Sequence, residues 1–241
     1  MISARHFALP HVLAHTMTLS QPLISFALAD LQPTQMTVGA AEVAAKRTQW
    51  VGLKRKERER LLTSHCFPAV KGPNGRYYIT DHHHLGMALH QEKVDKVWVM
   101  QLADLSDTEG ETFWRVMEFR RWAHPYDDQG RRADYAAIPT RISKLRDDPY
   151  RSLAGFVRQA GGYAKDAAPF SEFLWADFFR PLLSRRQLRI GGGSTLPPEL
   201  LQHAVALAHS KAAHYLPGWS GAGPSPTAGV ERPSIPDADL S

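Results

Sequence analysis

The sequence has only one cysteine, Cys66, among its 241 residues. A single thiol cannot form a disulfide bond within the chain, and unpaired cysteines are usual in reducing compartments. Long apolar runs are also missing, since none approaches the roughly 20 residues that a membrane-spanning helix needs. Residues 1–21 do not read as a signal peptide, because His6, His11 and His15 interrupt their apolar positions. These absences predict a cytoplasmic protein with no membrane partner.

The sequence also lacks a large excess of charge of either sign. Its formal net charge is +5 and its pI is about 9.4, which permits a polyanionic partner without requiring one. Six Trp, seven Tyr and ten Phe supply apolar surface for a sizeable core. The length predicts one domain, or one domain with an appendage.

The most distinctive stretch is a run of three histidines, His82, His83 and His84, preceded by Asp81. The β-prone residues 77–80 come before this run, and a helix-like pattern follows it as far as position 91. Asp81 is a good N-cap, which would place the histidines in the first helical turn. The free amides and the positive dipole end of such a turn suit a phosphate or another anion. The alternative is an ordinary capped helix with a polar first turn.

Three consecutive histidines on one helix cannot all face a single metal ion, because successive residues are about 100° apart. Two of them together with Asp81 could still hold a divalent ion such as Mg²⁺, and the predicted set is Asp81, His83 and His84. Histidine can also act as a general acid or base near neutral pH. Metal or acid–base chemistry, anion binding without catalysis and a purely structural cap therefore all remain open.

The flanking pattern predicts an α/β (α+β) fold with a small mixed sheet. Residues 67–71 and 76–80 flank an Asn-Gly turn and predict a hairpin. Residues 96–102 alternate and predict a strand after the histidine helix, in the order of a βαβ unit. Four regions are expected: an N-terminal arm at 1–23, the α/β domain at 24–122, a helical extension packed on it at 123–215, and a disordered tail at 216–241.

A second group of candidates precedes the histidines. A helix is expected from about 38 to 50, and it carries Glu42 and Lys46 at i and i+4. Glu42 could act as a general base while Lys46 neutralises a phosphate. The two could equally form an exposed ion pair worth only about 0.3–0.5 kcal/mol. Gln35, in the preceding turn, could hydrogen-bond a ligand.

The segments at 31–46, 78–84, 147–156 and 169–179 together resemble the ParB/sulfiredoxin superfamily, and most closely its branch of ParB-like nucleases. The resemblance spans roughly residues 24–185. It implies a ParB/sulfiredoxin-like domain whose signature box opens a helix and cradles phosphate, with the segment from Gln35 to Lys46 lying across it. The chain departs from the superfamily at two box positions. A histidine replaces the sulfiredoxin cysteine, and Leu85 replaces the phosphate-clamping arginine.

The resulting hypothesis is metal-assisted hydrolysis of a phosphodiester in a nucleotide or nucleic acid. A divalent ion near Asp81 and the histidines would polarise the phosphate and activate water. Glu42 or His83 would move the proton, while the expected ligand-binding residues are Gln35, Lys46, Asp81, His82 and His84. Two alternatives are a non-catalytic nucleotide- or anion-binding protein and a small-metabolite kinase that uses the same pocket for phosphoryl transfer.

Overall fold

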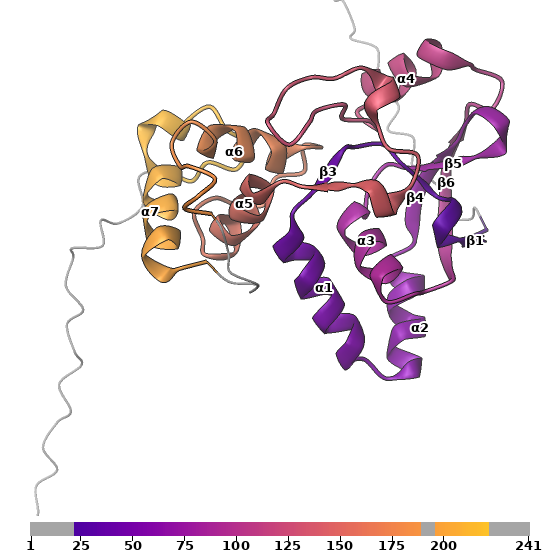
Figure 1. Ribbon diagram of the computed structural model, residues 1–241, viewed down its shortest axis with the longest axis horizontal. Coiled ribbons are helices and arrows are strands. Elements are labelled where there is room, and N and C mark those ends of the chain that lie inside the picture. The colour runs from indigo at the N-terminus through magenta and orange to yellow at the C-terminus, as the bar shows by residue number, and fades with distance from the viewer. Residues whose placement is uncertain (1–21, 189–195, 222–241) are drawn as a thin grey trace, which may run out of the picture.

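Five strands form a mixed sheet in the computed structural model, which describes residues 22–188 and 196–221 (Figure 1). Their order is β1-β6-β4-β5-β2. The β1/β6 and β4/β5 pairs are antiparallel, whereas the β4/β6 and β2/β5 pairs are parallel. The predicted mixed α/β fold is confirmed. The strands are β1 (Ile24–Ala27), β2 (Gln32–Pro33), β4 (Phe67–Lys71), β5 (Tyr77–Ile79) and β6 (Lys96–Asp104).

The expected hairpin is present, but the expected βαβ unit is not. Strands β4 and β5 pair across the turn at 72–75, where Asn74 adopts φ 59° and Gly75 φ 68°. Because the hairpin reverses the chain, β5 runs opposite to β4, and the strand that pairs in parallel with β6 is β4. The histidine helix therefore lies in a longer crossover from β4 to β6.

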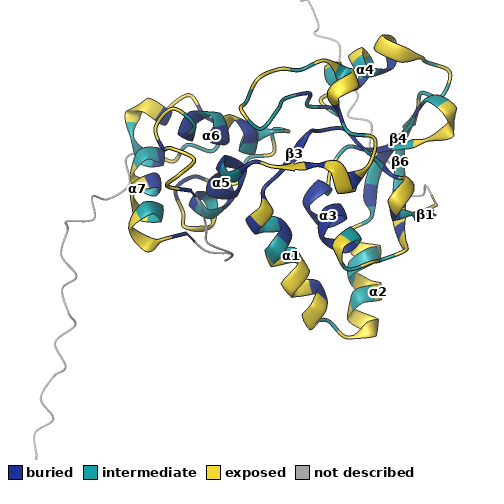
Figure 2. Ribbon diagram, in the orientation of Figure 1, coloured by how far each residue is buried: buried dark blue, intermediate teal, exposed yellow. Residues whose placement is uncertain are grey.

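The two faces of the sheet are covered by different helices. Alternation along the strands directs Ala69 and Ile79 to one face, where they join a cluster with residues of α1 (Ala40–Gly52) and α3 (His83–Gln91). The neighbouring positions Val70 and Tyr78 face the other side and pack on α4 (Gly110–Phe119). Helix α3 has seven buried residues, whereas α2 (Arg55–Ser64) has none (Figure 2). The mixed charges of α2 therefore lie on a solvated helix.

A second apolar cluster holds together α5 (Pro149–Gln159), α6 (Ser171–Phe179) and α7 (Pro198–His209), which gather on one side of the molecule (Figure 1). Trp175 stacks on Tyr163 at 4.1 Å between ring centroids. Leu216 is also buried in this cluster, and the Pro217 carbonyl accepts a hydrogen bond from Trp175 Nε1. The prediction of a disordered tail from 216 is therefore wrong for its first residues. Positions 222–241 of that tail and 1–21 of the arm lie outside the described residues.

A short parallel pair of strands joins the sheet region to the helical cluster. β3 (Thr37–Val38) pairs with β7 (Arg146–Asp147), and the Ala40 amide donates to Asp147 Oδ1 at 2.8 Å. A Cβ on Gly39 would lie only 2.8 Å from the Ser152 backbone nitrogen. The first turns of α1 and α5 therefore touch, which requires glycine at this contact. No described helix is long and apolar enough to cross a membrane.

Candidate functional site

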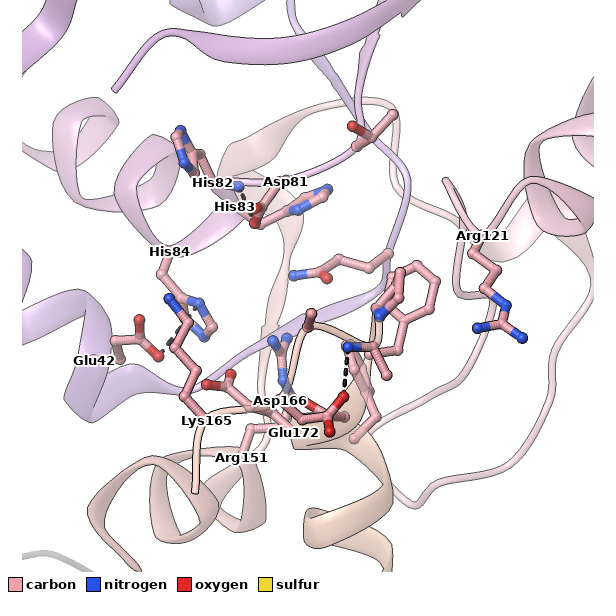
Figure 3. A pocket seen from close by; sticks show the side chains of 18 of the residues that line it. Glu42, Asp81, His82, His83, His84, Arg121, Arg151, Lys165, Asp166 and Glu172 are labelled. Atoms are coloured by element: carbon pink, nitrogen blue, oxygen red, sulfur yellow. Dashed lines mark hydrogen bonds and ion pairs between the residues drawn. The ribbon is translucent and has the colours of Figure 1, made fainter. Parts of the chain in front are cut away.

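A cleft of about 690 Å³ opens where α1, α3, α5 and α6 approach one another (Figure 3). The start of α3 and one side of α1 line it, as do residues of α5 and the segment at 165–173. All seven residues singled out from the sequence contribute to its lining, and they are Gln35, Glu42, Lys46, Asp81, His82, His83 and His84.

The histidine segment enters the helix differently from the prediction. His82, not Asp81, is the N-cap, and its backbone lies in the left-handed region at φ 64°. Asp81 is one residue too early to cap the helix, and its Oδ1 accepts the His82 amide at 2.6 Å. No side chain caps α3, and the amides of His83, His84 and Leu85 donate to no described residue. The turn therefore presents free amides, as a helix N-terminus does.

The rings of His83 and His84 hold the β2–β3–α1 segment in place. His83 Nε2 accepts the Thr34 amide at 3.1 Å, and His84 Nε2 accepts the Gly39 amide at 2.9 Å. Burial, with the nearby Arg151, lowers the pKa of His83 to about 3, and the same causes lower the pKa of His84 well below its ordinary value. Both rings are therefore neutral near pH 7. This corrects the prediction that His83 is a proton shuttle, because it takes up a proton only in strong acid.

The predicted metal set of Asp81, His83 and His84 is not assembled. Among the described residues, no group of three or more His, Cys, Asp or Glu side chains is placed to share a metal ion. The physical reason is that the Nε2 atoms of both histidines already accept backbone amides, and Asp81 binds the amide of His82. These side chains position the backbone around the cleft.

Glu42 is the carboxylate with the most perturbed environment in the cleft. Its Oε1 lies 3.7 Å from Lys46 Nζ, and its Oε2 lies 3.5 Å from His84 Nδ1 (Figure 3). Because the Gly39 amide occupies Nε2 of the neutral His84 ring, the ring proton resides on Nδ1, the nitrogen that faces Glu42. Burial raises the pKa of Glu42, and the nearby Glu172 raises it further. The Glu42–Lys46 pair is therefore not the freely solvated pair of the alternative interpretation.

Gln35 is less available than expected. The side chain is 4% exposed, and its Nε2 donates to the Thr37 carbonyl at 2.9 Å. The amide oxygen and the second hydrogen of Nε2 remain to meet a ligand. Its main role is therefore to stiffen the turn between β2 and β3.

Arg151, which the sequence analysis missed, is the central cation of the cleft. It is 5% exposed, and its guanidinium carbon lies 3.9 Å from the centroid of the Phe173 ring. Its Nη1 donates to the Thr37 carbonyl, and its Nε has no hydrogen-bond partner. No described carboxylate lies within ion-pair distance of it. A buried, unpaired guanidinium is costly, so its presence in the cleft wall is the feature that most needs an explanation.

A family model described as "Putative ParB-like nuclease" matches residues 24–181. The chain belongs to this family. The ParB-like chain is also similar to a solved structure, the crystal structure of protein Atu1540 from Agrobacterium tumefaciens, with 43% identity and a TM-score of 0.75. That match covers 83% of this chain and 98% of the other. No curated protein matches the sequence.

The remaining wall of the cleft in this ParB-like protein comes from its C-terminal half. Arg158 pairs with Glu172 at 3.1 Å, and Lys165 adds a cation from the segment before α6. Phe170, the N-cap of α6, adopts φ 64°, so two helices begin at the cleft with left-handed residues. One signal in the sequence could have identified Arg151: it is a cation in the first turn of α5, where the helix dipole favours anions.

Proposed function

We propose that the cleft binds a phosphodiester and that this protein hydrolyses it as a phosphodiesterase or nuclease. The observation that carries the proposal is the buried guanidinium of Arg151 in the same cleft as Glu42. A buried cation with no carboxylate within ion-pair distance, on which Glu172 and Glu42 act only from further away, is stabilised when an anion enters, and arginine offers two parallel donors that match a phosphate. The superfamily arginine that is absent at Leu85 is thus replaced by one from α5.

The start of α3 supplies the opposite side of the phosphate site. The free amides of His83, His84 and Leu85 and the positive dipole end of α3 favour an anion. A helix start alone is a weak indication, but here Arg151 lines the same cleft. Lys46 and Lys165 add positive charge at its walls. Together these groups favour a phosphate held between α3 and α5.

Glu42 is the proposed general base. A carboxylate whose pKa is raised by burial removes a proton from water more effectively than an exposed one. The water oxygen attacks phosphorus while Glu42 takes its proton, and the bond to the leaving oxygen breaks. Arg151 stabilises the negative charge on the non-bridging oxygens. His84 positions Glu42, because its ring nitrogens lie between the Gly39 amide and the Glu42 carboxylate.

Glu42→Gln tests this assignment with a side chain of the same shape. Hydrolysis of bis(4-nitrophenyl) phosphate, measured with and without Mg²⁺, should fall about 10²- to 10⁴-fold, the usual effect of losing a general base. Stabilisation of the fold by inorganic phosphate should remain. Glu111→Gln is the matched control, because Glu111 is exposed, pairs with Arg115 at i, i+4 and does not line the cleft.

Two results would contradict the proposal. A Glu42→Gln variant as active as the wild type would refute the role of Glu42 as base. If phosphate binds but no phosphodiester is hydrolysed under any of these conditions, hydrolysis is refuted, and the cleft is an anion-binding site without turnover.

A further inference from the structure

The segment at the C-terminal end of α4 exposes an unusual combination of side chains. Phe119 is 88% exposed, the highest value among the large hydrophobic residues that the structure describes. Arg120 and Arg121 follow it and are exposed as well, and Trp122 is half-buried. Neither arginine forms an ion pair with a described residue. A solvated phenylalanine beside two unpaired arginines has no role in packing.

This segment, residues 119–122, is continuous with the cleft. Arg121 and Trp122 both line the cleft, and Arg120 packs over the Trp122 ring with 5.1 Å from its guanidinium carbon to the ring centroid. Figure 3 shows Arg121 at the side of the cleft away from Glu42. A ligand seated beside Glu42 and Arg151 therefore has a path along the cleft towards Phe119.

Arg121 is held beside the cleft by an unusual backbone conformation. Arg121 adopts φ 56° as the chain leaves α4, with the Trp122 amide donating to the Met117 carbonyl at 2.8 Å. Glycine is the usual residue at this left-handed position after a helix, because a side chain there is strained. Lys93 has the same backbone conformation after α3, so what distinguishes Arg121 is that its side chain lines the cleft.

We propose that the 119–122 segment binds the nucleotides that flank the phosphodiester in a single-stranded nucleic acid. The inference rests on the proposed function, and it makes the substrate a polymer rather than a mononucleotide. Phe119 offers an exposed ring face to a base, Trp122 lines the cleft beside it, and the two exposed arginines offer charge to the neighbouring phosphates. This combination of stacking and positive charge binds single strands with little sequence preference.

The experiment measures the affinity of a fluorescent single-stranded oligonucleotide by anisotropy over a range of salt concentrations. Phe119→Ala should weaken binding about 5- to 100-fold, as for the loss of one stacked base. Arg121→Gly should weaken it too and reduce the slope of log K against log salt by about 0.7, as for one lost phosphate contact. Because glycine relieves the strained backbone, this variant should melt at or above the wild-type temperature.

Two matched control variants test whether the loss of affinity is specific to the 119–122 segment. Lys93→Gly removes a cation from another exposed left-handed position after a helix, at φ 57°, and Tyr215→Ala removes an exposed aromatic ring. Neither residue lines the cleft, so both variants should bind the oligonucleotide as the wild type does. In the test variants, oligonucleotide affinity should fall more than inorganic phosphate affinity.

The inference is overturned if Phe119→Ala and Arg121→Gly bind the oligonucleotide as tightly as the wild type. It is also overturned if the wild type binds it no more tightly than a mononucleotide, or if Phe119→Ala only converts a dimer to a monomer in sedimentation. Failure of the proposed function would give a different result. The wild type would hydrolyse no phosphodiester, while Phe119→Ala and Arg121→Gly would still bind the oligonucleotide more weakly than the wild type.

Discussion

The Arg151→Met variant tests whether Arg151 binds a ligand or only stabilises the fold. The change removes a charged hydrogen bond to the Thr37 carbonyl, worth about 1.5–3 kcal/mol, and the contact with the Phe173 ring, worth about 0.5–2 kcal/mol. It also removes a buried charge whose desolvation costs several kcal/mol. The Thr37 carbonyl is not left unpaired, because Gln35 still donates to it at 2.9 Å. The favourable and unfavourable contributions of Arg151 to the free energy of unfolding therefore nearly cancel.

We expect Arg151→Met to be as stable as the wild type, or up to about 2 kcal/mol more stable, in phosphate-free buffer. Urea unfolding followed by circular dichroism measures this difference. Inorganic phosphate at ten times its dissociation constant should stabilise the wild type by about 1.4 kcal/mol. The variant should gain almost nothing from phosphate, because the buried donor is gone.

Arg158→Met compares the stability effect of losing an ion-paired arginine of the cleft wall, seven positions later in the same helix. Arg158 pairs with Glu172 at 3.1 Å and is partly exposed, so losing it should cost up to about 1 kcal/mol. If Arg151→Met is more than about 2 kcal/mol less stable than the wild type, Arg151 is a structural residue. If phosphate stabilises that variant as much as the wild type, the phosphate site lies elsewhere.

Two further predictions concern the fold. The pKa of His83 is about 3 in the folded chain against an ordinary value near 6.5, so only the unfolded chain binds its proton between these pH values. Stability should therefore fall as pH drops below 6.5, by about 1.4 kcal/mol per pH unit for this ring. His83→Gln should remove this contribution to the pH dependence of the free energy of unfolding, measured by urea titration. A pH dependence as steep as that of the wild type would contradict the prediction. A chain ending at Tyr215 should be less stable than one ending at Gly221, because it lacks buried Leu216 and the Pro217 carbonyl bound by Trp175. Equal urea midpoints would show that these contacts contribute nothing.

Local patterns predicted much of the fold. Alternation identified β6, and the Asn-Gly pair identified the hairpin. Each signal depends on residues a few positions apart. The direction of β5 relative to β6 depends on how the whole crossover packs, which is why the βαβ prediction failed. Residue spacing does not predict the left-handed turn at His82 either, because few non-glycine residues adopt this conformation.

The sequence identified residues of the cleft more successfully than their roles. Seven candidates line one cleft, yet the rings of His83 and His84 bind backbone amides and stay neutral. Residue type suggested acid–base chemistry for them, but burial determines their pKa, and burial is a property of the packed structure. Burial acts on Glu42 in the opposite direction and raises its pKa. From the sequence alone, Glu42 could equally have formed an ordinary exposed ion pair with Lys46.

The position of Arg151, the arginine proposed to bind phosphate, explains why the helical extension matters for the proposed site. Leu85 is 6% exposed and belongs to the cluster between α3 and the sheet, so an arginine there would enter the core. Arg151 instead reaches the cleft from α5, and the β3–β7 pair and the close contact at Gly39 fix α5 against α1. A phosphate bound by both α3 and Arg151 would link the sheet region to the helical cluster. Bound phosphate should therefore stabilise that junction, as linkage requires.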